Sequence, residues 1–232
     1  MRDALKSLGT RAGFASLQVS NEANAGRAPN ASDGYYRGAK DALIKGVIAA
    51  KAEIRRSGHR QVKVGFNWAY ATDSTEGAFW RYLGRNGGRR FAAALDWVGL
   101  DAYPGTWGPG LAAGDLATAT GRFMDGALSR LRSTYMPLAG IARSVPLHVA
   151  ENGFPTGPGR TEAMQAAAMR AEVMAVYRAR LTYNITGYRW FDLRDADSSS
   201  SSFESQYGIL RDDYSAKAAF GVYGALVASL SR

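Results

Sequence analysis

Two glutamates in this sequence occupy positions that suit acid–base chemistry. Glu151 directly follows a short apolar run, Pro146–Ala150, and precedes a turn rich in Gly and Pro. The run predicts a buried strand, because it is too brief for a helix and Pro is tolerated at the first residue of a strand. A carboxylate at the end of a buried strand costs free energy unless it has a role there. Glu22 is placed similarly, after a second predicted strand, Phe14–Ser20.

Amide and aromatic side chains accumulate at the ends of the predicted strands. An asparagine adjoins each glutamate, Asn21 before Glu22 and Asn152 after Glu151, and the other candidates are Asn67, Trp68, Tyr103, Trp107 and Trp190. Sugar C–H faces pack on indole rings, hydroxyls bond to amides and phenols, and two acids can cleave an acetal. Each residue alone is more simply explained as a core or surface residue. Their agreement over four strand ends predicts a glycosidase that binds an oligo- or polysaccharide.

The elements that must position these residues alternate along the chain. The predicted strands are Phe14–Ser20, Gln61–Asn67, Leu95–Asp101, the run before Glu151, and Ile185–Phe191. The predicted helices are Tyr35–Ser57, Thr75–Phe91, one from Asp115 to Arg143 interrupted near Pro137, one capped by Thr161 that runs to about Leu181, and Ser215–Leu230. Such a βα repeat predicts a parallel α/β fold. Candidate residues after several different strands favour a (β/α)8 TIM-barrel type over a doubly wound sheet.

Composition narrows the possible partners. The chain of 232 residues suffices for one domain, and no linker divides residues 1–232. The net charge of +9 comes from scattered arginines, which predicts a solvated surface and no nucleic-acid partner. An apolar run of about 18 residues is absent, so no membrane span is expected. The segment Met1–Gly13 lacks the apolar core of a secretory signal, and the cellular location stays unknown.

Other catalytic chemistries find little support in the sequence. Cysteine is absent, which excludes disulfides, thiolate metal sites and a Cys nucleophile. The two histidines, His59 and His148, lack ligand spacing, and strand alternation predicts that His148 packs towards the helices, on the face opposite Glu151. A Gly-x-Ser-x-Gly elbow is missing, and Gly84–Gly88 lacks the Lys-Ser/Thr ending of a phosphate loop. We therefore expect neither a metal nor a cofactor.

Both glutamate motifs resemble those of the large clan of retaining glycoside hydrolases built on (β/α)8 barrels, which includes cellulases and mannanases. In that clan the acid/base is a Glu after Asn at the end of the fourth strand, and Gln18–Ala23 matches this pattern with Glu22. The nucleophile is a Glu at the end of the seventh strand, matched by Glu151 within His148–Gly153. The resemblance implies double displacement, with Asn21 bonding the 2-hydroxyl of the sugar.

The resemblance extends over nearly the whole chain. An aromatic residue after the sixth strand often contacts the nucleophile, and Asp101–Pro104 supplies Tyr103, which would align Glu151. A tryptophan at the end of the eighth strand commonly lies under the cleaved sugar, and Tyr188–Phe191 supplies Trp190. The last loop and helix of these enzymes also resemble two segments here, Tyr207–Leu210 and Lys217–Phe220.

The same comparison implies a partial barrel. If Glu22 ends the fourth strand, the five strands are numbers four to eight, and the first three βα units of the catalytic domain are missing from its N-terminal side. An ordinary barrel has about 250 residues. Strands four and eight would then be open edges through which the chain could self-associate. Upstream coding sequence for three more βα units would favour the enzyme.

Two other interpretations remain open at this stage. The chain could be a catalytically impaired or non-catalytic carbohydrate-binding fragment of a barrel that keeps the motifs. It could also be a different barrel enzyme, such as a proton-abstracting isomerase or lyase, which would require a metal or phosphate site that the sequence does not indicate. The sugar, the linkage and endo or exo action are not encoded in any motif found here, although the clan is often secreted.

Overall fold

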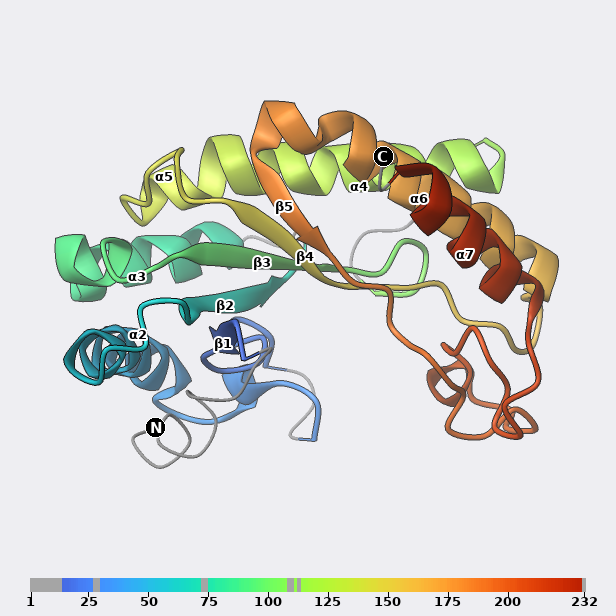
Figure 1. The fold of residues 1–232 in the computed structure, drawn as a ribbon, viewed down its shortest axis with the longest axis horizontal. Helices are drawn as coiled ribbons and strands as arrows, with labels where there is room; N and C mark the ends of the chain where they lie inside the picture. Colours follow the sequence, from blue (N-terminus) through green and yellow to red (C-terminus); the bar gives the residue numbers. More distant parts are fainter. Residues whose placement is uncertain (1–13, 27–29, 72–74, 108–110, 112–113, 231–232) are drawn as a thin grey trace. The chain divides into compact units, whose positions relative to one another are not determined.

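Strands and helices alternate in the computed structural model of the chain, which describes residues 14–26, 30–71, 75–107, 111 and 114–230 (Figure 1). The strands are β1 (Ser16–Gln18), β2 (Lys63–Ala69), β3 (Trp97–Ala102), β4 (Leu147–Asn152) and β5 (Ile185–Tyr188). They follow one another in the sheet in chain order, and both β1 with β2 and β2 with β3 pair in parallel. The predicted α/β class is confirmed. The segment Met1–Gly13, where no secretory signal is expected, lies outside the described residues.

Two compact units make up the chain. Unit 1 comprises Met1–Asp101 and Arg130–His148, and unit 2 comprises Ala102–Ser129 and Val149–Arg232. The expectation of one catalytic domain over residues 1–232 stays a prediction.

Unit 1 contains the helices α2 (Ala39–Arg56) and α3 (Glu76–Ala92). Its core is built from large apolar side chains, including Leu43, Val47, Ile54, Phe66, Trp68, Trp80 and Phe91. The Gly-rich second half of α3 stays helical, with a kink at Gly88, where φ is 53°. A Cβ atom at Gly84 would lie 2.5 Å from the Leu138 carbonyl oxygen. Only Gly therefore permits this close approach of the two backbones.

The predicted interruption near Pro137 is confirmed. Helix α4 (Leu116–Arg130) widens into a π-helical turn, Leu131–Tyr135, before the short α5 (Met136–Leu138). Pro has no N–H, and its ring would clash with the carbonyl four residues earlier, so a regular helix cannot continue through it. Arg132, in the π-helical turn, donates to the carbonyls of Arg143 and Val145 just before β4. Burial, and then the charge of Arg143, lower the pKa of Arg132 to about 10.

In unit 2, α6 (Glu162–Tyr183) and α7 (Ala218–Leu230) pack against each other (Figure 1). Their shared core contains Met169, Ile209, Ala219 and Leu226. The predicted cap at Thr161 is confirmed, since its hydroxyl accepts a 3.2 Å hydrogen bond from the Met164 N–H. In the described part of the chain, no helix combines the length and the apolar character needed to cross a bilayer.

Candidate active site

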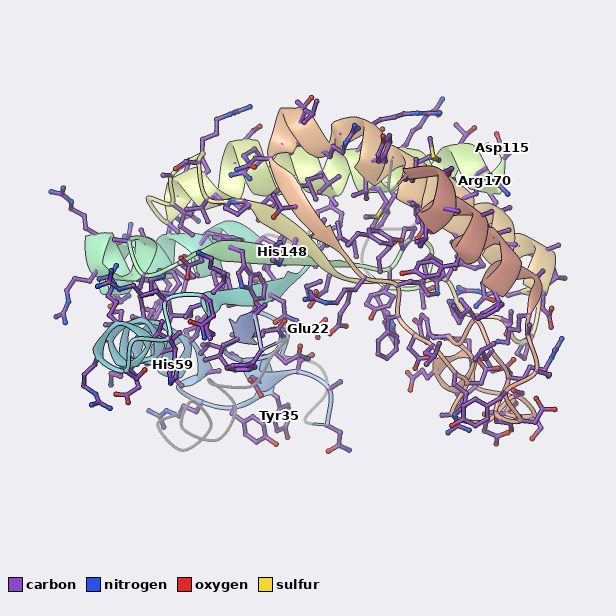
Figure 2. All side chains as sticks on the ribbon, in the orientation of Figure 1. Glu22, Tyr35, His59, Asp115, His148 and Arg170 are labelled. Atoms are coloured by element: carbon purple, nitrogen blue, oxygen red, sulfur yellow. The ribbon has the colours of Figure 1, made fainter. Side chains whose placement is uncertain are left out.

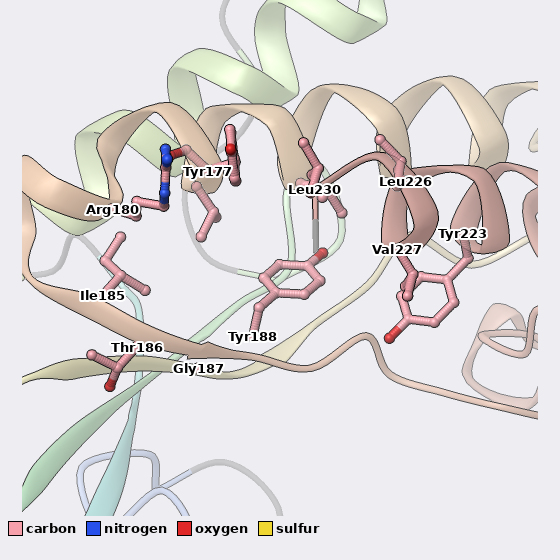
Figure 3. A pocket seen from close by; sticks show the side chains of 12 residues that line it. Tyr177, Arg180, Ile185, Thr186, Gly187, Tyr188, Tyr223, Leu226, Val227 and Leu230 are labelled. Carbon is pink, nitrogen blue, oxygen red and sulfur yellow. The ribbon is translucent and has the colours of Figure 1, made fainter. Parts of the chain in front are cut away.

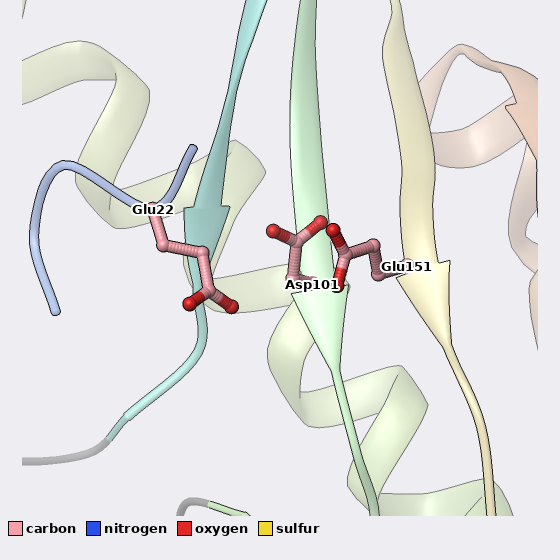
Figure 4. A group of neighbouring side chains, drawn as sticks. All are labelled: Glu22, Asp101 and Glu151. Atoms are coloured by element: carbon pink, nitrogen blue, oxygen red, sulfur yellow. The ribbon is translucent and has the colours of Figure 1, made fainter. Parts of the chain in front are cut away.

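Glu22 lies in the loop that follows β1 of unit 1 (Figure 4). Its backbone N–H donates a 2.9 Å hydrogen bond to Oδ1 of Asn67 on β2, and its carboxylate accepts a hydrogen bond from the Ser32 hydroxyl. The backbone of Glu22 is left-handed, with φ of 47°, a conformation that non-glycine residues adopt rarely. Hydrogen bonds thus hold both the backbone and the carboxylate of this half-buried residue.

The loop that carries Glu22 is attached at two further points. Oδ2 of Asp33 accepts 2.8 Å hydrogen bonds from the Ser20 hydroxyl and from the Asn21 N–H. Asn24 pairs with the backbone of Ala69 at the end of β2, donating to the carbonyl at 2.8 Å and accepting from the N–H at 3.1 Å. These contacts restrict the positions that the loop can adopt.

Asn21 and Asn67 come together beside Glu22, as the sequence predicts, but both amides bond to the protein itself. Asn67 is 1 % exposed, and its Nδ2 donates to Asn21 Oδ1 at 2.6 Å and to Asp101 Oδ2. Nδ2 of Asn21 in turn donates to the Ala31 carbonyl at 2.7 Å. The contacts seen for both residues therefore position the Glu22 loop.

Asp101 is a carboxylate near the end of β3 to which the sequence analysis assigned no role. It is 2 % exposed, and one of its oxygens lies within 4.8 Å of a carboxylate oxygen of Glu22 (Figure 4). Two carboxylates at this distance repel each other unless hydrogen bonds or a proton compensate. Asn67 donates one hydrogen bond to Asp101, and Ser32 donates one to Glu22. The signal in the sequence was the same as for the glutamates, since Asp101 ends a predicted strand.

The predicted sugar contact of Trp68 is corrected by its burial. Trp68 is 0 % exposed, its indole N–H donates to the carboxylate of Glu76, and its ring packs against Trp80 and Tyr135. A side chain enclosed in this way cannot stack on a ligand. The reason is that β2 lies in the interior of unit 1, so that residues on both of its faces are buried.

The histidines of unit 1 lie on separate elements, His59 after α2 and His148 on β4 (Figure 2). A packed role for His148 is confirmed, because its ring stacks on Trp97 with the centroids 4.7 Å apart. Its predicted direction towards the helices is wrong. Trp97 lies on β3 four residues before Asp101, and residues at even spacing along a strand share a face. His148 therefore packs on the face of the sheet that carries Asp101.

Glu151 lies on β4 one residue before its end (Figure 4). It belongs to unit 2 together with Tyr103. The Tyr103 hydroxyl donates a 2.7 Å hydrogen bond to Oε2 of Glu151. Glu151 itself is half-buried. The structure thus brings together the two residues that the sequence analysis paired, and the phenol orients the carboxylate.

An aromatic cluster adjoins this hydrogen bond in unit 2. The rings of Tyr103, Phe191 and Tyr207 meet edge to face, with centroids 5.4 to 6.1 Å apart. Tyr207 is buried, and burial raises the pKa of its hydroxyl, whereas Phe191 is 40 % exposed. Phe191 is therefore the accessible ring of the cluster, and the sequence analysis did not assign it a role.

Trp190 is placed differently from the residue that follows it. It packs against the core cluster of Met169, Ile209, Ala219 and Leu226, and its indole nitrogen is buried. The peptide bond between Phe191 and Asp192 is cis. The family resemblance implies that Trp190 lies under the sugar, but in the structure this ring packs against the helix core and Phe191 is the accessible one.

Trp107 is 46 % exposed, in agreement with the accessible position that a sugar contact requires. Its ring lies 5.8 Å from that of Phe203, centroid to centroid. Arg160 secures the adjoining backbone by donating to the Gly105 carbonyl at 2.7 Å and to the Thr106 hydroxyl at 2.6 Å. Burial lowers the pKa of Arg160, but the guanidinium remains charged at neutral pH.

A buried ion pair organises the loop after β5 in unit 2. Lys217 Nζ lies 2.7 Å from Oδ2 of Asp195, and both side chains are almost fully buried. Asp195 also accepts from the Gly208 N–H and the Ser198 hydroxyl, and Lys217 donates to the Thr156 hydroxyl at 2.8 Å. Because these charges are hydrogen-bonded on several sides, the pair can hold this long polar loop in one conformation.

A separate pocket of about 440 Å³ lies between α6, β5 and α7 (Figure 3). Its walls are mainly apolar, and none of the predicted site residues contributes to them. The lining side chains include Tyr177, Ile185, Tyr188, Tyr223, Leu226 and Leu230. This pocket is therefore distinct from the surroundings of Glu151.

Comparison with known proteins identifies the fold and no closer relationship. The sequence matches no protein-family model and no curated protein. Among solved structures, it resembles a glycoside hydrolase family 17 β-1,3-glucanosyltransferase from Rhizomucor miehei over 94 % of this chain and 68 % of that one, with 18 % identity and a TM-score of 0.54.

Two β-glucosidases resemble the chain more closely in TM-score. For the enzyme from Thermotoga maritima, solved with galacto-hydroximolactam, the TM-score is 0.65 at 15 % identity, over 99 % of this chain and 66 % of that one. For the enzyme from Exiguobacterium marinum, the TM-score is 0.63 at 16 % identity, over 100 % and 67 %. The chain thus spans about two thirds of these glycosidases, and its α/β fold corresponds to part of a (β/α) TIM barrel.

Proposed function

We propose that the protein is a retaining glycoside hydrolase that cleaves β-linked O-glycosidic bonds, with Glu151 as nucleophile and Glu22 as acid/base. The observation that carries the proposal is that Glu22 lies in the loop after β1, Glu151 lies near the end of β4, and each carboxylate is held by hydrogen bonds of its own. Tyr103 binds Glu151, while Asn67 and Ser32 bind Glu22. A fold shared with glycosidases supports the same assignment.

In the first half of the proposed reaction, a carboxylate oxygen of Glu151 bonds to the anomeric carbon. The bond from this carbon to the leaving oxygen breaks, and that oxygen takes the proton of Glu22. In the second half Glu22 removes a proton from water, the water oxygen bonds to the anomeric carbon, and the ester to Glu151 breaks. Each carboxyl group returns to its starting state, and the sugar keeps its anomeric configuration.

Neighbouring residues have supporting roles in this proposal. Tyr103 aligns the nucleophile, because its hydroxyl already bonds to Glu151. Phe191, rather than Trp190, stacks on the sugar ring, since it is the accessible ring beside Tyr103. Asn21 holds the Glu22 loop instead of binding the 2-hydroxyl, because its amide bonds to Ala31 and Asn67.

The direct test is a hydrolysis screen with β-linked aryl glycosides and oligosaccharides, in which NMR follows the anomeric configuration of the first product. We expect turnover with retained configuration by the wild type and none by Glu151→Ala. Inverted configuration would contradict the assignment of Glu151, and saccharide binding without hydrolysis would instead indicate a carbohydrate-binding protein.

An experimental structure provides a second test through the separation of the two carboxyl groups. Retaining enzymes place them about 5–5.5 Å apart, whereas inverting enzymes need room for a water and use about 6.5–9.5 Å. We expect the retaining separation between Glu22 and Glu151. A separation beyond about 10 Å would eliminate the pair as catalytic partners.

A further inference from the structure

The turn that carries Glu22 has a backbone conformation that is rare for residues other than glycine. Both Ser20 and Glu22 are left-handed, with φ of 69° and 47°. A side chain makes this conformation unfavourable, and such residues keep it only where surrounding contacts hold them. Strand β1 ends at Gln18, before the turn begins. Contacts outside β1 must therefore hold the turn.

The segment Ala31–Gly34 supplies many of these contacts, with Asp33 at its centre. Asp33 Oδ2 accepts hydrogen bonds from the Ser20 hydroxyl and from the Asn21 N–H, each at 2.8 Å. The Asp33 N–H donates to the Asn21 carbonyl at 2.8 Å, and the Ala31 carbonyl accepts from Asn21 Nδ2 at 2.7 Å. The backbone N–H, the carbonyl and the side-chain nitrogen of Asn21 are thus all bonded to one short segment.

Gly34 brings the same segment into direct contact with the residues that follow Glu22. A Cβ atom at Gly34 would lie 2.4 Å from the Ala25 carbonyl oxygen and 2.8 Å from the Ala25 nitrogen. Only glycine permits so close an approach of the two backbones. The Ala25 N–H in turn donates a 2.9 Å hydrogen bond to the Glu22 carbonyl. The segment therefore contacts the chain on both sides of Glu22.

We infer that the segment Ala31–Gly34 holds Glu22 in its left-handed conformation, and that Asp33 is a positioning residue that sets where the Glu22 carboxyl group lies. This inference rests on the proposed function, because it assigns the fixed position of Glu22 to proton transfer. Ser32 bonds to the carboxylate itself, whereas Asp33 acts through the backbone of Asn21. An acid/base must lie within hydrogen-bond reach of the oxygen that it protonates. A displacement of about 1 Å can cost about 100-fold in rate.

The test compares Asp33→Ala, Asp33→Asn and Ser32→Ala in the whole chain. Asp33→Ala removes the acceptor of the hydrogen bonds from Ser20 and Asn21, whereas Asp33→Asn keeps an oxygen that can accept them. Asp213→Ala is the matched control, since Asp213 is exposed and its Oδ1 also accepts a 2.8 Å hydrogen bond from a backbone N–H.

Two readouts are measured on each variant. The first is kcat/KM for β-linked aryl glycosides with poor and with activated leaving groups. The second is the carbon NMR signal of the Glu22 carboxyl group, which is assigned by its absence in Glu22→Gln. A general loss of structure would lower kcat/KM for both substrate types, whereas a displaced acid affects the poor leaving groups selectively.

We expect Asp33→Ala to lower kcat/KM for poor leaving groups about 10- to 100-fold, with little change for activated ones. Ser32→Ala should act in the same direction, and both variants should shift the Glu22 signal. Asp33→Asn should keep most of the wild-type rate. Ser32→Ala removes only a hydroxyl, so it provides the same comparison if Asp33→Ala does not fold.

Equal losses on both substrate types in a folded Asp33→Ala variant, or a loss of the same size in Asp213→Ala, would overturn the inference. An unshifted Glu22 signal in both Asp33→Ala and Ser32→Ala would do the same. An inactive wild type in which these variants shift the Glu22 signal would remove the proposed function but retain the link between Asp33 and Glu22.

Discussion

The hydroxyl of Tyr103 and Oε2 of Glu151 lie 2.7 Å apart, and both residues belong to unit 2. A hydrogen bond to a charged group contributes about 1.5–3 kcal/mol. If this bond orients the nucleophile, Tyr103→Phe should lower kcat/KM by about 10- to 100-fold. Tyr214→Phe, which removes a hydroxyl from an exposed ring, is the control. Equal rates for wild type and Tyr103→Phe would show that Tyr103 does not contribute to catalysis.

The two glutamates should be distinguishable by their substrates. Glu151→Ala should abolish turnover of every glycoside, and azide should not restore it with retained configuration. Glu22→Ala should slow substrates with poor leaving groups far more than activated aryl glycosides, because the latter need little acid assistance. The measurement is kcat/KM for both substrate types. Equal losses on both would mean that the roles of acid/base and nucleophile are misassigned.

Truncation of Phe191 should lower activity, whereas truncation of Trp190 should lower stability. Phe191→Ala should leave folding intact and lower kcat/KM about tenfold, since a stacked ring contributes on the order of 1 kcal/mol. Trp190→Ala should lower the free energy of unfolding by about 3 kcal/mol, because it removes a ring from the core between α6 and α7. Urea unfolding and kinetics on both variants test this. The reverse pattern would restore Trp190 as the sugar-facing ring.

Replacing one partner of the buried ion pair Lys217–Asp195 should strongly lower the free energy of unfolding. Lys217→Met leaves Asp195 buried without its cation, which should lower the free energy of unfolding by about 3–5 kcal/mol. Replacing both residues, Lys217→Met with Asp195→Leu, should cost less than the sum of the single changes. Arg211→Met at the pair with Glu162, in which both side chains are about one third exposed, is the control, where we expect about 0–1 kcal/mol. Additive losses in the double variant would contradict a coupled pair.

The fully buried carboxyl group of Glu172, on α6, should make stability depend on pH. The pKa of Glu172 in the folded protein is raised above 4.5. The contribution of Glu172 to the free energy of unfolding is therefore fully present below pH 4.5, and it is lost as the pH rises through the folded pKa. Over this window the unfolded chain releases the proton while the folded chain retains it.

Glu172→Gln does not titrate, and its stability relative to wild type should therefore rise with pH, by up to about 1.4 kcal/mol per unit. Urea unfolding at several values between about pH 5 and about pH 8 measures the trend. Glu204→Gln, at an exposed carboxyl, serves as the control. A constant difference between Glu172→Gln and wild type would show that Glu172 has an ordinary pKa.

Short sequence patterns were enough to predict most of the strands and one contact of the candidate site. Apolar runs ending at turn residues marked the regions of β2 to β5, although β1 and β5 are shorter than expected. The pairing of Tyr103 with Glu151 followed from a family resemblance and agrees with the hydrogen bond in the structure. Asp101 also ends a predicted strand, but no local pattern indicates that its carboxylate lies beside that of Glu22.

The sequence by itself determined the α/β class and the presence of Glu22 and Glu151 at the ends of strand regions, because strand periodicity and turn residues act over a few neighbouring positions. Only the tertiary structure decided which polar and aromatic side chains are accessible. Trp68 is enclosed by residues distant in sequence and Trp190 packs against a core built from such residues, whereas Phe191 is exposed. The complete burial of Glu172 likewise depends on residues distant in sequence, and burial by distant elements leaves no mark in a local pattern.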